Sequence, residues 1–286
     1  MRSVFRSILV LAAVALAAAC SSEKVQVAPP DELYRQATQD FVDGNYSISI
    51  QTYKYLLDHY PLDDRAEDVE LRIAEAQFAD GAYPEAIASY TDFQRMHPTS
   101  PRLAEVEYQI GMAYVGQMDT IDRDLNAAAN AHARFESVIV RFPKSEYAKR
   151  AKEQLKAVRE HLASRELYVA QFYIHQGNHA AARIRVGNML VTYPETNAAT
   201  DAIALIASDA HSTGDDDIAA LADAAYAESQ AEVAADSTGA SGTTRRAGTP
   251  TVQALQMRLA PNAVASPITP LSPPSSTAKS AAKPVL

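Results

Sequence analysis

The sequence has a single cysteine, Cys20, no tryptophan and only 10 glycines in 286 residues. One cysteine excludes an intrachain disulfide, so the cysteine count alone does not indicate a redox compartment. Few glycines together with abundant alanine favour helices over sheet, because alanine has the highest helix propensity. Hydrophobic residues make up 47% of the chain, which is enough for a sizeable core. Composition therefore favours an all-α protein.

Positive charge is also scarce in most of the chain. The formal net charge is −9, and residues 21–232 carry 19 Lys and Arg against 34 Asp and Glu. The balance reverses from residue 233 onward, where five basic residues stand against one acidic residue. Nucleic-acid binding needs a basic face, so the acidic body argues against it. An acidic body also does not attract anionic lipid.

Short motifs that carry catalysis are missing from the sequence as well. There is no Gly-rich phosphate loop, no HExxH pair and no G-x-S-x-G elbow. His175 and His179 have the four-residue spacing of a metal site on a helix, but a Gly-Asn turn separates them, so we interpret them as packing or exposed residues. The run Asp215–Asp217 is open to an ion-site interpretation, yet it begins a predicted helix, where acidic groups complement the dipole. We predict no catalytic residue, metal site or cofactor.

The first twenty residues have the pattern of a secretory signal. Two arginines precede twelve apolar residues, Ile8–Ala19, and three alanines lead into Cys20. The apolar run is too short to span a bilayer, so residues 1–19 are predicted to be a signal peptide. Two other interpretations remain open, an ordinary signal peptide with a chance cysteine and an uncleaved membrane anchor.

The sequence LAAAC followed by SSE resembles the lipobox of bacterial lipoproteins. In that family the cysteine is lipidated and the peptide before it is removed, which implies lipidation at Cys20. The usual lipobox has Leu three residues before the cysteine, where this chain has Ala17. By the same resemblance, Ser21 after the cysteine favours sorting to the outer membrane. Residues 20–30 are then the lipidated tether.

Glycine and proline recur at fixed distances along residues 31–232, which indicates internal repeats. Glycines close four apparent helices, in two pairs that are each 37 residues apart: Gly44 and Gly81, Gly177 and Gly214. A small residue stands seven positions before each glycine: Ala37, Ala74, Ala170 and Ala207, with Gly111 in the same position of another unit. Prolines stand 17 residues after three of the glycines, and a fourth proline closes the remaining unit: Pro61, Pro98 and Pro194, with Pro143 as the fourth.

A residue with a helix-capping side chain stands two positions after every one of these prolines: Asp63, Ser100, Ser145 and Thr196. Such side chains satisfy free N–H groups at a helix start, and proline forbids continuation of the helix before it. The pattern predicts an all-α, TPR-like helical-repeat solenoid of about five helix-turn-helix units, with a period slightly above the usual value of about 34 residues. The predicted units are 31–65, 66–102, 103–144, 145–195 and 196–232.

Two units are longer than the others. The third has an insertion over 118–126, with the sequence MDTIDRDLN, and the fourth has no Gly or Pro between Ser145 and Gln176. We predict one long helix there, roughly 48 Å at 1.5 Å per residue, which joins the two halves of the array. The alternative is two helices with a kink near Ala163. Residues 233–286 are rich in Ala, Pro, Ser and Thr and are predicted to be disordered, with a weak helix over Thr251–Leu259 as the exception.

The lipobox, the five units, the IDRD insertion and the long joining helix together resemble the BamD family of outer-membrane protein assembly lipoproteins. The similar stretches are ARFESVIVRFPKSEYAKRAKEQL, REHLASRELYVAQFY and AARIRVGNMLVTYPET. The resemblance covers about residues 31–225. The degenerate fifth unit and the long tail depart from the family pattern.

This resemblance implies a non-enzymatic subunit of the outer-membrane β-barrel assembly machinery, lipid-anchored on the periplasmic face of the outer membrane. The C-terminal repeats are expected to dock on a POTRA domain of the barrel subunit BamA, and the N-terminal repeats to receive unfolded outer-membrane proteins. Other Bam lipoproteins are further expected partners. Arg185 matches a basic residue at the POTRA contact, with an ordinary surface arginine as the alternative.

Two other function classes stay open. One is a different periplasmic TPR lipoprotein, acting as a cell-wall or division scaffold. The other is an enzyme with helical-repeat architecture, such as a transglycosylase. The enzyme would need a separate catalytic domain, and residues 233–286 are too sparse to form one.

Overall fold

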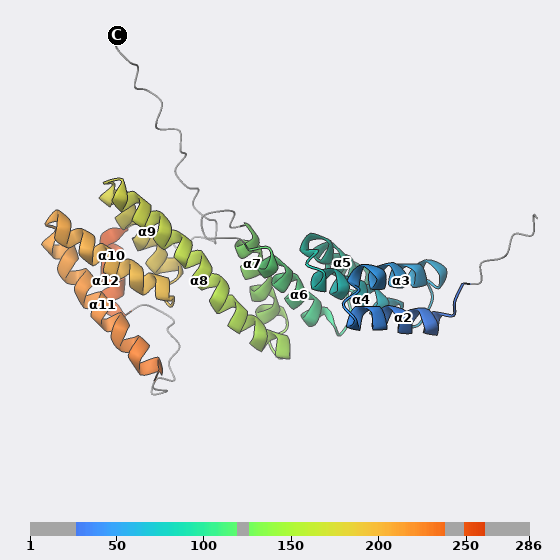
Figure 1. Ribbon diagram of the computed structural model, residues 1–286. Coiled ribbons are helices and arrows are strands. Elements are labelled where there is room, and N and C mark those ends of the chain that lie inside the picture. Colours follow the sequence, from blue (N-terminus) through green and yellow to red (C-terminus); the bar gives the residue numbers. More distant parts are fainter. Residues whose placement is uncertain (1–26, 119–125, 238–248, 261–286) are drawn as a thin grey trace, which may run out of the picture. The chain divides into compact units, whose positions relative to one another are not determined.

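The computed structural model describes residues 27–118, 126–237 and 249–260. Within these ranges every regular element is an α-helix, so the predicted all-α class is confirmed (Figure 1). The predicted signal peptide over 1–19, Cys20 and most of the insertion lie outside the described residues. Most of the tail beyond residue 237 lies outside them as well.

The chain divides into two compact units, the first of which ends at Arg72. It contains α2 (Pro30–Val42), α3 (Tyr46–His59) and the start of α4 (Ala66–Ala79). Ala37 on α2 is fully buried, and its carbonyl accepts a 2.8 Å hydrogen bond from the buried hydroxyl of Ser49 on α3. The small residue of the repeat therefore allows α3 to pack closely on α2, as predicted.

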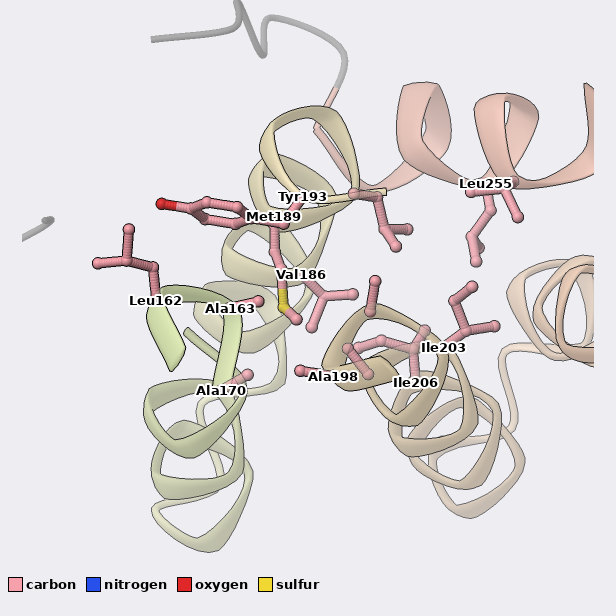
Figure 2. Packing of buried hydrophobic residues seen from close by; sticks show 14 of the residues in the cluster. Leu162, Ala163, Ala170, Val186, Met189, Tyr193, Ala198, Ile203, Ile206 and Leu255 are labelled. Atoms are coloured by element: carbon pink, nitrogen blue, oxygen red, sulfur yellow. The ribbon is translucent and has the colours of Figure 1, made fainter. Parts of the chain in front are cut away.

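The second unit begins at Ile73 and holds the remaining helices. They are α5 (Tyr83–Met96), α6 (Leu103–Gly116), α7 (Asn126–Arg141), α8 (Glu146–His175), α9 (His179–Thr192), α10 (Asn197–Thr213), α11 (Asp216–Ser237) and α12 (Pro250–Leu259). A continuous core runs through α6 to α12. Figure 2 shows side chains of α8, α9 and α10 meeting in this core, with Leu255 reaching it from α12.

The turns between helices follow the repeat pattern. The four turn glycines have φ between 71° and 79°, a left-handed conformation that only glycine adopts without strain. An added Cβ would meet no atom within 4 Å at any of them, so the backbone conformation and not lack of space requires glycine. Four second helices, α3, α5, α7 and α9, each end two residues before a repeat proline. The predicted glycine turns and proline stops are confirmed.

Two of the four predicted caps are confirmed. Ser145 precedes α8 and accepts a hydrogen bond from the amide of Tyr147 at 3.2 Å. Thr196 precedes α10 and accepts from the amide of Ala199 at 3.2 Å. Both helices therefore begin with a side chain that satisfies one of their free N–H groups.

The prediction is wrong for Asp63 and Ser100, because α4 and α6 begin three residues after them. Each accepts a hydrogen bond from the amide two residues further on, at 2.9 and 3.2 Å. Their carbonyls accept from the amides of Ala66 and Leu103, which closes a separate turn before each helix. The side chains cap that turn and not the helix itself.

Helix α8 is continuous over 30 residues, from Glu146 to His175. The predicted single long helix is confirmed, and the alternative of two helices meeting near Ala163 is wrong. Ala163 is fully buried in the core that α8 shares with α9 and α10 (Figure 2). At its other end α8 packs on α6 and α7, where the rings of Tyr147 and Tyr108 lie 5.6 Å apart. One helix thus contributes to the core over its whole length.

The tail forms a packed helix over part of its length. The expectation of disorder from residue 233 is wrong for residues 233–237, which form the end of α11, and for residues 249–260. The short helix expected over Thr251–Leu259 is confirmed as α12. Val252, Leu255 and Leu259 recur at helical spacing and are at most 5% exposed. These side chains pack on α9 and α11, which gives this short part of an Ala-, Pro-, Ser- and Thr-rich tail enough apolar contact to fold.

Candidate partner-binding site

Arg185, the predicted partner-binding residue, lies on α9 and points toward α8. Its Nη1 donates to Oε2 of Glu166 at 2.6 Å. The side chain of Arg185 is 7% exposed and that of Glu166 is 14% exposed. A charge-assisted hydrogen bond with so little solvent access is among the stronger contacts between two helices. The guanidinium is therefore held between α8 and α9, so an ordinary surface arginine is not what the structure shows.

The turn between α9 and α10 is held by two adjacent residues of α8. Arg159 donates to the side chain of Glu195 and to the carbonyl of Thr192, the last residue of α9. Glu160 accepts from the amides of Asn197 and Ala198 at 2.8 and 2.9 Å. A cation at a helix C-terminus and an anion at a helix N-terminus both complement the helix dipole. Arg159 and Glu160 together set the position of α9, and therefore of Arg185, against α8.

Tyr193 lies in the same turn, with the guanidinium of Arg159 5.2 Å from the centre of its ring. Burial raises the pKa of Tyr193 to about 12, with the nearby carboxylate of Glu166 acting in the same direction. The phenol therefore stays neutral at physiological pH and serves packing.

A second ionic group joins α9 to α10 and α11. Arg183 donates from Nε to Asp209 at 3.1 Å and from Nη1 to Asp215 at 2.7 Å. Asp209 is 1% exposed and also contacts Nδ1 of His179 at 2.5 Å. The hydrogen bond from Arg183 lowers the pKa of Asp215. The arginine thus fixes the α10–α11 turn onto α9.

The structure also shows the surroundings of the two sequence motifs that were open to an ion-site interpretation. Asp215 precedes α11 and accepts a hydrogen bond from the amide of Ile218 at 3.4 Å, so the capping interpretation is confirmed. His175 ends α8 and is exposed, whereas His179 begins α9 and is paired with Asp209. In the part of the chain that the structure describes, no three His, Cys, Asp or Glu side chains gather in a metal-binding arrangement.

A surface pocket of about 520 Å³ lies between α9, the α10–α11 turn and α12, and residues of this second ionic group form part of its lining. Its lining is His179, Ala180, Arg183, Ile184, Thr213, Asp215, Ile218, Arg258 and Leu259. Ile184 is 52% exposed at its edge. The pocket therefore combines charged side chains, such as Arg183 and Asp215, with apolar ones.

Sequence reasoning missed the buried polar groups of the α5–α8 region. Glu107 on α6 is 2% exposed and accepts from Gln94 at 2.5 Å and from Arg134 at 3.4 Å. His132 on α7 is 3% exposed, and burial lowers its pKa. Glu107 stands three positions from the buried residues Ala104 and Ile110, so a helical-wheel analysis could have marked it as buried. Its partners come from other helices, and no local pattern predicts them.

None of the described helices is long and apolar enough to cross a membrane.

The fold and its ionic groups define a helical-repeat protein in which charged side chains bind helices to one another, a class whose members commonly bind other proteins. Residues 26–225 match the model of the family YfiO, described as outer membrane lipoprotein. The chain belongs to this family, and the resemblance to BamD proteins is confirmed. It is a non-enzymatic member, as the family of assembly factors implies.

Several relatives carry the name outer membrane protein assembly factor BamD. The chain is 27% identical to that of Pasteurella multocida over 208 residues, which is 69% of this chain and 80% of the relative. It is 28% identical to that of Vibrio cholerae over 201 residues, 66% of this chain and 83% of the relative. A shorter match of 92 residues to that of Xylella fastidiosa is 35% identical and covers 32% of each chain.

Proposed function

We propose that this protein is an assembly factor for outer-membrane proteins, associated with the outer membrane. The observation that carries the proposal is the family match over residues 26–225, which includes α2 to α10 and about half of α11. The names of the relatives from Pasteurella multocida and Vibrio cholerae support the same function.

In finer detail, we propose that the repeats bind two kinds of partner. The C-terminal repeats dock on the POTRA region of BamA, and the N-terminal repeats bind unfolded outer-membrane β-barrel proteins. Lipidation at Cys20 anchors the chain on the periplasmic face, where other Bam lipoproteins join it. The continuity of α8 supports this division, because one helix holds α9 and α10 in a defined geometry that a folded partner domain can recognise.

Arg185 is proposed to contribute to POTRA docking. Of the three guanidinium nitrogens of Arg185, Nη1 is the one that donates to another described residue. Nε and Nη2 can therefore donate to an acidic group of a partner protein. Glu166 holds the guanidinium in one orientation for such a contact. Because the side chain of Arg185 is 7% exposed, only a small part of the guanidinium is open to such a partner.

Co-purification from detergent-solubilised outer membranes tests the proposed function. The expected result is recovery of a large barrel protein that contains POTRA domains. Recovery of peptidoglycan enzymes without that barrel would contradict the proposal and favour the cell-wall scaffold. The variant Cys20→Ser tests the anchor separately, because it should keep the fold but lose the outer-membrane fraction. Fractionation at the wild-type level would contradict lipid anchoring.

The double variant Arg185→Gln with Glu166→Gln tests the docking residue. Removing both charges leaves neither one buried without its partner, so the fold should survive. Recovery of the barrel protein should fall, while the helical circular-dichroism signal stays unchanged. The matched control removes the exposed ion pair of α5, through Arg95→Gln with Asp92→Asn. Equal recovery with both double variants would count against a role of Arg185 in docking.

A further inference from the structure

Positive charge is concentrated in one short segment of the repeat array. Residues 141–156 contain six Lys and Arg against two Glu, whereas the rest of residues 31–232 contains 12 Lys and Arg against 31 Asp and Glu. Four of the five lysines of the array stand in this segment: Lys144, Lys149, Lys152 and Lys156. The acidic average of the chain therefore hides a local basic region.

The fold places these lysines on one surface. Lys149, Lys152 and Lys156 follow one another at spacings of three and four residues in the first half of α8, so they form a stripe along one side of the helix. Lys144 stands in the turn just before α8 and Arg141 ends α7. All five side chains are exposed. We call this surface the basic face.

The basic face keeps most of its charge. Arg150 lies beside it and is paired with Glu146 at 3.3 Å. Glu153, four residues after Lys149 and three before Lys156, is exposed on the same side of α8 and offsets one of the positive charges. None of the four lysines has an ion-pair partner among the described residues. A cationic surface without internal partners is free to attract an anionic one.

The residue type indicates which anionic surface fits. Lysine is depleted at protein–protein interfaces, where arginine is enriched. Its ammonium is a strongly hydrated point charge on a flexible stem, which suits a diffuse layer of phosphates better than a fixed carboxylate. Lysines near an anionic bilayer add attraction in proportion to their number. We propose that the basic face contacts an anionic phospholipid surface.

Two further observations agree with a lipid surface. Val140, which precedes Arg141 in the last turn of α7, is 77% exposed, so an exposed apolar side chain close in sequence to the cations is available to enter the headgroup region. Repulsion between lipid and the acidic remainder of the array is screened beyond about 10 Å at moderate salt. The local charge therefore outweighs the net charge of the chain at close approach.

Lysine labelling of the full-length chain on vesicles tests this proposal. The chain is reconstituted into vesicles of phosphatidylcholine, alone or mixed with phosphatidylglycerol, and acetylated with a water-soluble ester. Mass spectrometry then gives the acetylation of each lysine. Acetylation of Lys149, Lys152 and Lys156 should fall severalfold on the anionic vesicles, and salt near 1 M should restore it because the screening length drops to about 3 Å. The exposed Lys54 on α3 is the internal control and should not change.

A triple variant tests whether the positive charge of the basic face causes the protection. Lys149→Gln, Lys152→Gln and Lys156→Gln together leave Lys144 as the reporter, and Lys144 should lose its protection on anionic vesicles. The matched control Lys54→Gln should leave that protection intact. Equal acetylation of the basic face on both vesicle types at low salt would overturn the proposal, and that is the outcome if this face instead binds an acidic protein.

Discussion

Arg185 of α9 and Glu166 of α8 form an ion pair with 2.6 Å between Nη1 and Oε2, shielded from solvent on both sides. Two positions earlier on α9, Arg183 pairs with Asp209 of α10 at 3.1 Å. Residues two apart on a helix point to nearly opposite sides. The two arginines therefore tie α9 to a different neighbour on each side, and this explains how a helix of 14 residues is held in one orientation.

Removal of Arg185 alone should destabilise the protein strongly. Arg185→Ala leaves Glu166, whose side chain is 14% exposed, without its partner, and breaking a buried ion pair in this way typically costs about 3–5 kcal/mol. Urea unfolding followed by circular dichroism measures the loss. The matched control is Arg95→Ala, whose side chain is 73% exposed, and a loss within about 0.5 kcal/mol is expected there. Equal losses in the two variants would show that the Arg185 pair adds nothing to stability.

Leu255 should anchor α12. Its side chain is fully buried, so Leu255→Ala should cost about 2–5 kcal/mol of local stability. Hydrogen exchange should then become faster in the amides of α12, and to a smaller extent in α9. Met257→Ala is the control, because that side chain is 60% exposed on the same helix. Unchanged exchange in the Leu255 variant would mean that α12 does not depend on this contact.

Ser145 and Ser100 occupy the same repeat position but should respond differently to mutation. Ser145 caps α8, so Ser145→Ala should cost about 1 kcal/mol of unfolding free energy. Ser100 caps only the turn before α6, so Ser100→Ala should cost less. Urea midpoints of the two variants, measured side by side, provide the comparison. A larger loss at Ser100 would contradict the helix starts described above.

Stability should decline at mildly acidic pH because of His132. Burial lowers the pKa of His132 below 6.5, Arg159 acts in the same direction, and Glu136 and Glu195 oppose it. Below about pH 6.5 the unfolded chain therefore binds a proton more readily than the folded chain, so stability is lost as pH falls, whereas at neutral pH both states are uncharged.

The variant His132→Gln should flatten this part of the stability–pH curve, as followed by urea midpoints over a range of pH. The exposed His211 provides the control variant His211→Gln, which should keep the decline. A curve with the same slope in the His132 variant and in the wild type would assign the decline to other groups.

Sequence patterns predict the turns and the ends of the helices well, because the causes of these features are local. A left-handed turn requires glycine at that residue, and a proline blocks a helix wherever it stands. The cap positions were predicted less well, since Asp63 and Ser100 show that the same side chain can cap a turn or a helix. Which one it caps depends on where the backbone begins its regular hydrogen bonds.

The tail and the candidate site, in contrast, depend on contacts between helices that local sequence patterns do not predict. Composition marks residues 233–286 as rich in Ala, Pro, Ser and Thr, but Leu255 is buried because α9 and α11 offer a surface for it. The position of Arg185 was found from a sequence resemblance, whereas its pairing with Glu166 depends on the packing of α9 against α8. The two residues are 19 positions apart, which is beyond the reach of local periodicity.

The sequence by itself determined the helical class, the glycine turns, the proline stops and the continuity of α8, because each follows from the conformational preferences of residues near one another in the chain. Tertiary structure alone decided that Arg185 is shielded, that Asp209 and Glu107 are buried charges with partners, and that α12 folds onto the array. The physical reason is that burial and ion pairing depend on which helices meet, and those contacts join residues distant in sequence.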